Sequence, residues 1–157
     1  MADADVFIGV SAGNLLTAAD VATMADRSIV FAMANPTPEI DPAEAVQHAE
    51  VVATGRSDFA NQINNVLAFP GVFRGLLDAH ATRVSDRMLL AAARALADVV
   101  TDEELNPTYI VPSVFDERVT KAVAGAVENV AREELGTVDT ITGAMPAIYA
   151  DEITLEG

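Results

Sequence analysis

Residues 27–34, Arg-Ser-Ile-Val-Phe-Ala-Met-Ala, form one of three short apolar runs that decide the fold of this chain. The other two are residues 5–10, Asp-Val-Phe-Ile-Gly-Val, and residues 50–54, Glu-Val-Val-Ala-Thr. Each run has the length of a strand and ends at turn-forming residues. The run at residues 5–10 is apolar at every position from Val6 to Val10, and this lack of alternation predicts a strand buried on both faces.

Amphipathic segments separate the three predicted strands. Thr17 is placed to cap a helix over Ala18–Ala25, and Asp41, followed by Pro42, is placed to cap a second helix that ends near Ala49. Strands joined by short helices form parallel sheets with right-handed connections. The sequence therefore predicts an α/β fold, part of a Rossmann-like doubly wound parallel sheet.

The second half of the chain is predicted to be helical. Asn61–Asp78 is a long apolar segment interrupted by Pro70, so it forms either one kinked helix or two helices. Ser85 is the expected cap of a helix to about Val100, with Leu89, Ala92, Ala93, Leu96 and Val100 on its buried face. Asp116 is the expected cap of another helix to about Leu135. Thr108–Val111 is expected to be a short extended piece.

These segments predict a division of the chain into three parts. Residues 1–78 are expected to form the C-terminal half of a Rossmann-type domain, and residues 79–136 a helical C-terminal portion. Residues 137–157 are expected to form an extended or poorly ordered tail.

The chain is strongly acidic, with 24 Asp and Glu against 9 Lys and Arg and a net charge of −15. A phosphate backbone would be repelled, so nucleic-acid binding is disfavoured. The acidic surface suggests adaptation to high salt, although an ordinary acidic cytosolic protein is an alternative. The chain has no cysteine, which excludes disulfides and thiolate metal sites. It shows no signal peptide and no apolar run long enough to span a bilayer, so we expect a cytoplasmic protein without a membrane partner.

Asparagines gather near the predicted strand ends: Asn35, then Asn61, Asn64 and Asn65. In open parallel sheets, ligands bind outside the carboxyl ends of the strands. An amide offers two donors and one acceptor without charge, which suits holding a carboxylate or carboxamide. Asn35 and Asn61 are equally well explained as caps of turns. This explanation is weaker for Asn64 and Asn65, which stand in an apolar segment where unpaired amides would be costly.

The other polar candidates give weaker signals. His48 and His80 are isolated in the sequence, so surface roles are favoured over metal binding. Lys121 is expected to be a solvated helix residue.

Several ordered blocks of sequence resemble the prokaryotic form of the malic enzyme family. They are Phe7-Ile8-Gly9-Val10-Ser11, Phe31-Ala32-Met33-Ala34-Asn35-Pro36-Thr37-Pro38-Glu39, Ala53-Thr54-Gly55-Arg56-Ser57-Asp58-Phe59, Asn61-Gln62-Ile63-Asn64-Asn65, Phe69-Pro70-Gly71-Val72-Phe73-Arg74-Gly75, and Tyr109-Ile110-Val111-Pro112-Ser113. The resemblance covers residues 3 to about 132. Together with the acidic composition it suggests a haloarchaeal type.

The resemblance implies oxidative decarboxylation of L-malate to pyruvate and carbon dioxide, with NAD or NADP and a divalent metal, Mg or Mn. Asn35 matches the asparagine that lies between nicotinamide and malate. Asn64 and Asn65 match the pair that contacts the malate carboxylates. Val10, Ser11 and Ala12 match the loop along the nicotinamide ribose.

In the family, the Tyr and Lys acid/base pair, the acidic metal ligands and the glycine-rich phosphate loop lie upstream of these blocks. The resemblance therefore implies no catalytic and no metal-binding residue in this chain, which is expected to be a truncated, split or partial product. Its expected partners are the N-terminal part of the enzyme and further copies in a homo-oligomer. Two other hypotheses remain: a non-catalytic nucleotide-binding or interaction module, and a half-domain of a dehydrogenase for another 2-hydroxy acid.

Overall fold

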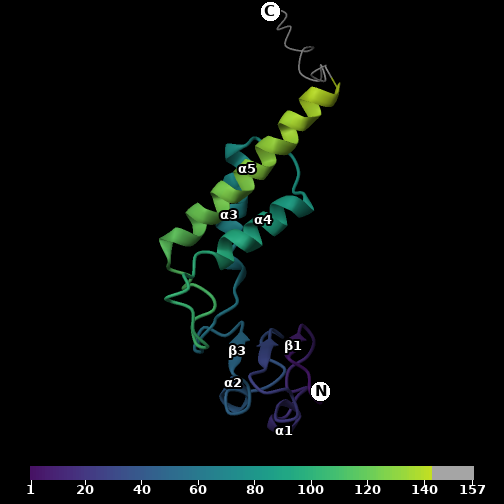
Figure 1. The fold of residues 1–157 in the computed structure, drawn as a ribbon, viewed down its shortest axis with the longest axis vertical. Coiled ribbons are helices and arrows are strands. Elements are labelled where there is room, and N and C mark those ends of the chain that lie inside the picture. Colours follow the sequence, from purple (N-terminus) through teal and green to yellow (C-terminus); the bar gives the residue numbers. More distant parts are fainter. Residues whose placement is uncertain (143–157) are drawn as a thin grey trace, which may run out of the picture.

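A computed structural model of the chain describes residues 1–142, with the side chains of residues 1–136. The chain forms a sheet half that contains the N-terminus and a helical half that carries the C-terminal part (Figure 1). No described helix has both the length and the apolar character needed to cross a membrane.

The sheet half contains the three predicted strands, β1 (Val6–Gly9), β2 (Ile29–Ala32) and β3 (Val51–Thr54). They are parallel and lie in the order β1-β2-β3. The connections are α1 (Ala18–Val21) and α2 (Pro42–Ala45), which start where predicted but are much shorter. Both have the predicted N-caps: Thr17 forms a capping box with Asp20, and Asp41 accepts a hydrogen bond from the Ala43 N–H.

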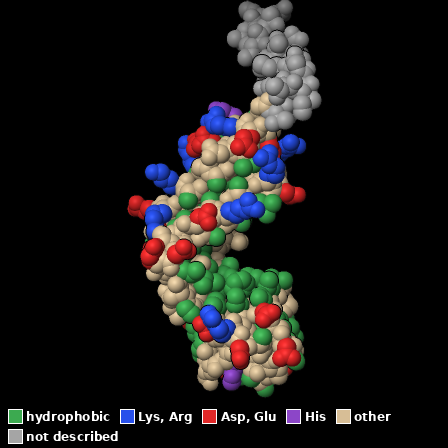
Figure 2. Space-filling model, viewed as in Figure 1, with side chains coloured by type: hydrophobic (Ala, Val, Ile, Leu, Met, Phe, Trp, Pro, Cys, Tyr) green, Lys and Arg blue, Asp and Glu red, His purple; other side chains and the backbone are tan. Residues whose placement is uncertain are grey.

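The two faces of the sheet differ in burial. The face that packs on α1 and α2 carries Phe7, Val30 and Val52, which stand in register across the strands. On the opposite face, Val6 and Ile8 of β1 are 47% and 63% exposed. The prediction that β1 is buried on both faces is therefore wrong for the described chain, because both connecting helices lie over one face only. Hydrophobic side chains gather on the sheet half where it borders a hollow between the halves (Figure 2).

The helical half consists of the 3-10 turn η1 (Asn65–Leu67), α3 (Phe69–Asp78), α4 (Asp86–Ala97) and α5 (Glu117–Thr142). Pro70 lies in the first turn of α3, where its missing N–H costs no helical hydrogen bond. The apolar segment 61–78 is thus a turn followed by one helix. Two glycines let α3 approach α5 closely: a Cβ on Gly71 would lie 2.6 Å from the Val123 Cβ, and one on Gly75 would lie 2.5 Å from the Ala124 carbonyl oxygen.

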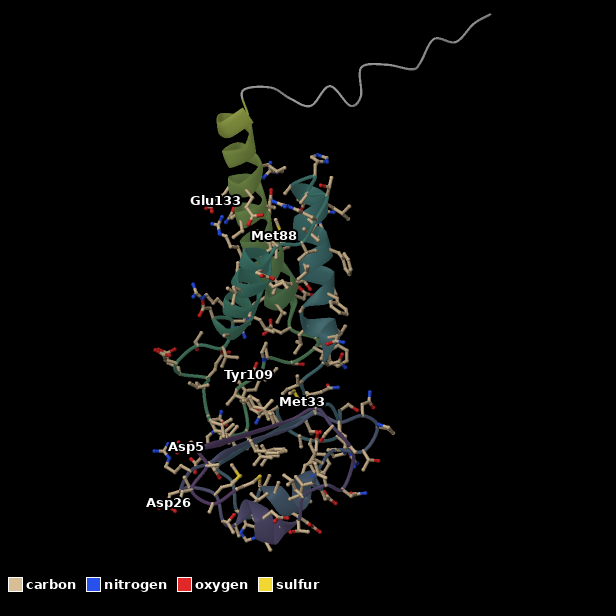
Figure 3. All side chains as sticks on the ribbon, turned by 90° about the vertical axis from the view of Figure 1, so that its right-hand side faces the viewer. Asp5, Asp26, Met33, Met88, Tyr109 and Glu133 are labelled. Atoms are coloured by element: carbon tan, nitrogen blue, oxygen red, sulfur yellow. The ribbon has the colours of Figure 1, made fainter. Side chains whose placement is uncertain are left out.

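Ser85 caps α4 as predicted, accepting a hydrogen bond from the Met88 N–H. The buried stripe of this region is rotated from the predicted one, because Met88, Ala92 and Val99 face the core while Leu89 is 52% exposed. In α5, Val119, Val123 and Val127 face the core and are buried. Met88 lies among the three helices (Figure 3).

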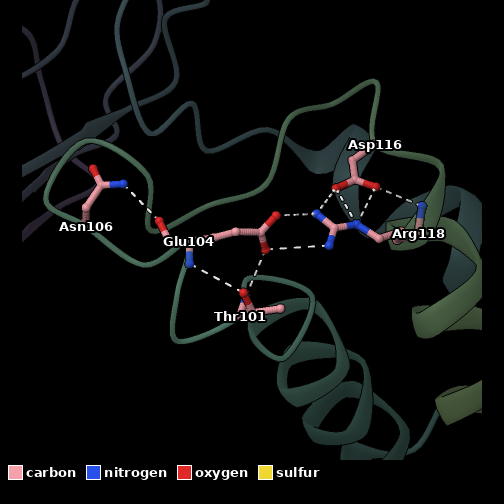
Figure 4. A network of polar contacts seen from close by, with 5 residues as sticks. All are labelled: Thr101, Glu104, Asn106, Asp116 and Arg118. Atoms are coloured by element: carbon pink, nitrogen blue, oxygen red, sulfur yellow. Dashed lines mark hydrogen bonds and ion pairs between the residues drawn. The ribbon is translucent and has the colours of Figure 1, made fainter.

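No strand forms over residues 108–111, where a short extended piece was predicted, and this part of the chain has only an isolated antiparallel bridge between Asn106 and Tyr109. Ion pairs hold the loop between α4 and α5. Arg118 at the start of α5 pairs with Asp116 at 2.7 Å and with Glu104 at 3.2 Å (Figure 4). The hydrogen bond with Asp116, and then that with Glu104, raises the pKa of Arg118. In turn the Glu104 carboxylate accepts a hydrogen bond from the Thr101 N–H. These contacts fix where α5 begins.

The predicted domain boundaries after residues 78 and 136 stay predictions. Within the described structure, α3 belongs to the helical core, where it packs against α5. The helix α5 continues to Thr142, so the predicted end near Leu135 and the extended start of the tail are wrong for residues 137–142. The rest of the predicted tail lies outside the described residues.

Candidate functional site

A crevice of about 500 Å³ opens at the carboxyl ends of β2 and β3. It is lined by Met33, Ala34, Asn35, Pro36, Gly55, Arg56, Ser57, Asp58, Gln62, Ile63, Asn64 and Asn65. This is the position predicted for a ligand site in a parallel sheet. Three of the four asparagines singled out in the sequence share the crevice. Its β2 end, marked by Met33, lies on the side of the sheet half that faces the helices (Figure 3).

Asn35 comes from the loop after β2 and is exposed to solvent. It is followed by a cis peptide bond to Pro36. Because β2 is the central strand, this loop lies between the loops that follow β1 and β3.

Asn64 and Asn65 reach the same crevice from the segment after β3. Asn64 caps η1 by accepting a hydrogen bond from the Val66 N–H at 3.0 Å. Both side chains are exposed. The two amides therefore do not lie in the apolar surroundings expected from the sequence, because the segment turns toward solvent before Leu67 enters the core. Among the described residues, no hydrogen bond occupies the Asn65 side chain, so its amide is available.

Asn61 has a structural role outside the crevice. Its side chain is buried, donates to the carbonyl oxygens of Val52 (3.0 Å) and Pro107 (2.9 Å), and accepts from the Ile110 N–H (2.8 Å). All three hydrogen bonds of the Asn61 side chain are made to backbone atoms. It therefore ties β3 to the loop that contains Tyr109, which lies between the two halves (Figure 3).

Val10, Ser11 and Ala12 follow β1 and are exposed. They do not line the crevice, but Ser11 is joined to its border by the buried carboxylate of Glu39. The Ser11 N–H and hydroxyl donate to Glu39 Oε1 at 2.8 and 3.1 Å, and the Ala34 N–H donates to Oε2 at 3.0 Å. Burial acts to raise the pKa of Glu39, but these hydrogen bonds to the ionised carboxylate outweigh burial and lower it. Sequence reasoning missed Glu39, whose partners are 28 and five residues away.

Arg56 is the basic side chain of the crevice lining. Its guanidinium donates to both carboxylate oxygens of Asp58, at 2.9 and 2.5 Å, and lies 5.0 Å from the centre of the Phe59 ring. The hydrogen bond to Asp58 raises the pKa of Arg56 and lowers that of Asp58. The crevice thus combines four side-chain amides, those of Asn35, Gln62, Asn64 and Asn65, with one paired cation, a set of groups able to hold an anionic or polar ligand.

The described residues do not fit a divalent metal. Among them, no three His, Cys, Asp or Glu side chains converge as a metal site requires. His48 and His80 are both exposed, as is Lys121 on α5. No metal-dependent step is therefore assigned to this part of the chain.

Comparison with known proteins gives a consistent match. Residues 1–132 match the family model described as "Malic enzyme, NAD binding domain". The NAD-dependent malic enzyme of Geobacillus stearothermophilus is 60% identical over 127 residues, which are 81% of this chain and 27% of that protein. The bifunctional malic/malolactic enzyme of Bacillus subtilis is 55% identical over 132 residues, 83% of this chain and 32% of that protein.

A solved structure gives the same match. The crystal structure of malic enzyme from Pyrococcus horikoshii superposes with a TM-score of 0.77 at 44% identity, covering 84% of this chain and 31% of that one. The chain thus spans about a third or less of these proteins. The two curated relatives are bacterial, so they lend no support to a haloarchaeal type.

Proposed function

Because this chain belongs to the malic enzyme family, we propose that it forms the part of an NAD(P)-binding domain that faces nicotinamide and malate. The reaction would be the oxidative decarboxylation of L-malate to pyruvate and carbon dioxide. By itself the chain would not turn over, since the proposal places the acid/base groups and the metal ligands elsewhere in the enzyme.

One observation carries the proposal: Asn35, Asn64 and Asn65 line a single crevice although 30 positions separate the first from the last. The sheet brings them together, because β2 and β3 are parallel and the segments that follow them therefore start at the same edge of the sheet. The amide of Asn65 is free to bind, and that of Asn64 retains its two N–H donors while its oxygen caps η1. Donors of this kind suit the two carboxylates of malate.

In this proposal each group has a positioning role. Asn64 and Asn65 hold the carboxylates of malate, and Asn35 lies between malate and the nicotinamide. Val10, Ser11 and Ala12 border the nicotinamide ribose. NAD or NADP bound beside these residues would supply the acceptor for the hydride of malate C2. By fixing the two reactants side by side, these residues lower the entropic part of the barrier.

Other features belong to the same proposal. The enzyme would use Mg or Mn held by residues outside this chain, and it would act in the cytoplasm as a homo-oligomer. The charge of −15 supports adaptation to high salt. The choice between NAD and NADP depends on the residue near the ribose 2′ position, which these residues do not provide.

A transplant tests the proposal. Residues 1–132 replace the matching segment of the Geobacillus stearothermophilus NAD-dependent malic enzyme, and oxidation of malate is measured with NAD or NADP and Mn. We expect activity from the chimera and none from the chain assayed alone in high salt. A chimera that folds with the secondary structure and assembly of the parent but oxidises no malate would refute the proposal. Turnover by the chain alone would contradict the placement of the catalytic groups elsewhere.

A further inference from the structure

Glu39 is a fully buried carboxylate with 0% of its surface exposed. It lies on the connection between Pro36 and α2, outside the crevice lining. Among the described residues it forms no ion pair, so its charge is stabilised by donors from the backbone and one hydroxyl. Carboxylates are rarely fully buried in proteins unless they are paired or hydrogen-bonded.

The carboxylate joins the ends of two strands. Oε1 accepts from the Ser11 N–H (2.8 Å) and hydroxyl (3.1 Å) in the loop after β1, and Oε2 accepts from the Ala34 N–H (3.0 Å) directly after β2. Ala34 precedes Asn35, the central asparagine of the crevice. One side chain therefore links the Ser11 loop to the residue that precedes Asn35.

The surrounding backbone is built around the same contact. The Leu16 N–H donates to the Glu39 carbonyl oxygen at 2.8 Å, and the Met33 N–H donates to the Gly9 carbonyl oxygen at 3.0 Å. A Cβ on Gly9 would lie 2.5 Å from Glu39 Oε1, so a side chain at position 9 would displace the carboxylate. The space for the Glu39 side chain thus depends on glycine at the end of β1.

We infer that Glu39 is a positioning residue that holds the loop of Ser11 and Ala12 at a fixed distance from Asn35. This inference rests on the proposed function, in which that loop borders the nicotinamide ribose and Asn35 lies between nicotinamide and malate. Two carboxylate oxygens are required, since each accepts from a different loop. Glutamine has the same shape but offers one oxygen and one NH₂ group. The N–H of either Ser11 or Ala34 would then meet an NH₂ donor in place of an oxygen acceptor.

The kinetic test uses Glu39→Gln in the active chimera that carries residues 1–132. We expect kcat to fall about tenfold or more at 25 °C, because a shift of a fraction of an ångström in the reactants has effects of this order. The matched control is Asp41→Ala, two residues along, which removes the cap of α2; the Asp41 side chain accepts its hydrogen bond from the Ala43 N–H and forms none with either loop. The control should keep kcat within about twofold of the parent chimera. A Glu39→Gln enzyme that unfolds at lower temperature but keeps kcat within about twofold would overturn the inference.

A second measurement does not depend on catalysis. Amide hydrogen exchange of the whole chain, followed by NMR, reports on the Ser11 and Ala34 N–H groups. We expect both to be protected in the wild type and at least one to exchange about tenfold faster in Glu39→Gln, with Val30 in β2 unchanged. Equal protection of both amides in the two proteins would overturn the inference. If the chimera is inactive, the proposed function fails, while the exchange result still decides whether Glu39 links the loops.

Discussion

Replacing Asn61 by alanine should destabilise the chain more than any replacement of the crevice asparagines. The Asn61 side chain is 5% exposed and makes three hydrogen bonds to the backbone of β3 and of the loop at 107–110. Alanine leaves the carbonyl oxygens of Val52 and Pro107 and the N–H of Ile110 without these partners. The connection between the sheet half and the helical half is then weakened.

The size of the effect follows from two contributions. A hydrogen bond of this kind contributes about 1 kcal/mol net, so three bonds contribute about 3 kcal/mol. Asn61 also has a φ of 54°, in the left-handed region, where alanine costs about 1 kcal/mol. We therefore expect Asn61→Ala to lower the free energy of unfolding by about 4 kcal/mol. Asn61→Gly avoids the backbone cost and should lower it by about 3 kcal/mol.

The assay is urea unfolding of the whole chain followed by circular dichroism, combined with hydrogen exchange of amides in β3 and α5. The two halves have separate cores, so exchange distinguishes a local opening at Asn61 from loss of either core. The Ile110 amide should lose protection first. Asn106→Ala is the matched control: its side chain also makes three hydrogen bonds, but Asn106 is exposed, so water replaces them and the cost should be about 0.5 kcal/mol or less.

Two results would refute the reasoning. Asn61→Ala within about 1 kcal/mol of the wild type would mean that the hydrogen bonds do not carry the connection. An alanine variant that is more stable than the glycine variant would mean that the left-handed backbone at this position imposes no cost.

The remaining predictions concern packing, acid and salt. Gly75→Ala should lower the free energy of unfolding by about 1–3 kcal/mol because its Cβ would meet the backbone of α5; the control, Gly125→Ala, has open space and should be neutral or stabilising. Equal effects in urea unfolding would contradict this packing. Glu39 has a lowered pKa, so its contribution is present above the ordinary glutamate pKa and is lost as pH falls through the lower folded value. Thermal unfolding of the wild type should therefore depend more steeply on pH below about 4.3 than that of Glu39→Gln, and parallel curves would be evidence against it. Raising KCl from about 0.1 to about 1 M should raise the Tm of this acidic chain as repulsion is screened, whereas an unchanged or lower Tm would argue against salt adaptation.

The sequence predicted the strands from local patterns, and the shared crevice from the rule that ligands bind at the carboxyl ends of parallel strands. Three apolar runs bounded by turns gave β1, β2 and β3, and parallel pairing then placed Asn35 near Asn64 and Asn65. The N-caps Thr17, Asp41 and Ser85 were also predicted, since a cap is set by residues within one turn of it.

Side-chain hydrogen bonds to residues far along the chain could not be predicted from local patterns. Glu39 stands in an ordinary-looking turn sequence, and nothing local indicates that its carboxylate reaches Ser11. The role of Asn61 depends on Pro107 and Ile110, far along the chain. The one available signal for Glu39 was an acidic residue directly before the buried Ile40.

Burial was the other source of error. The exposure of Val6 and Ile8 arises because α1 and α2 both cover the opposite face of the sheet, which a pattern of apolar residues cannot reveal. Unpaired amides at Asn64 and Asn65 were expected to be costly because their neighbours in the sequence are apolar, but both residues are exposed, since the chain turns outward there. The length of an apolar segment therefore did not determine which of its residues enter the core.

The malate Michaelis constant of Asn65→Ala in the active chimera tests the central claim most directly. Asn65 suits this test because its side chain lines the crevice and has no hydrogen bond to other described residues, so stability should be unaffected. Losing a hydrogen bond to a carboxylate should raise the KM for malate about tenfold and lower kcat, while the surface control Gln47→Ala leaves both unchanged. Values of KM and kcat within about twofold of the parent chimera would contradict the assignment of this crevice to malate.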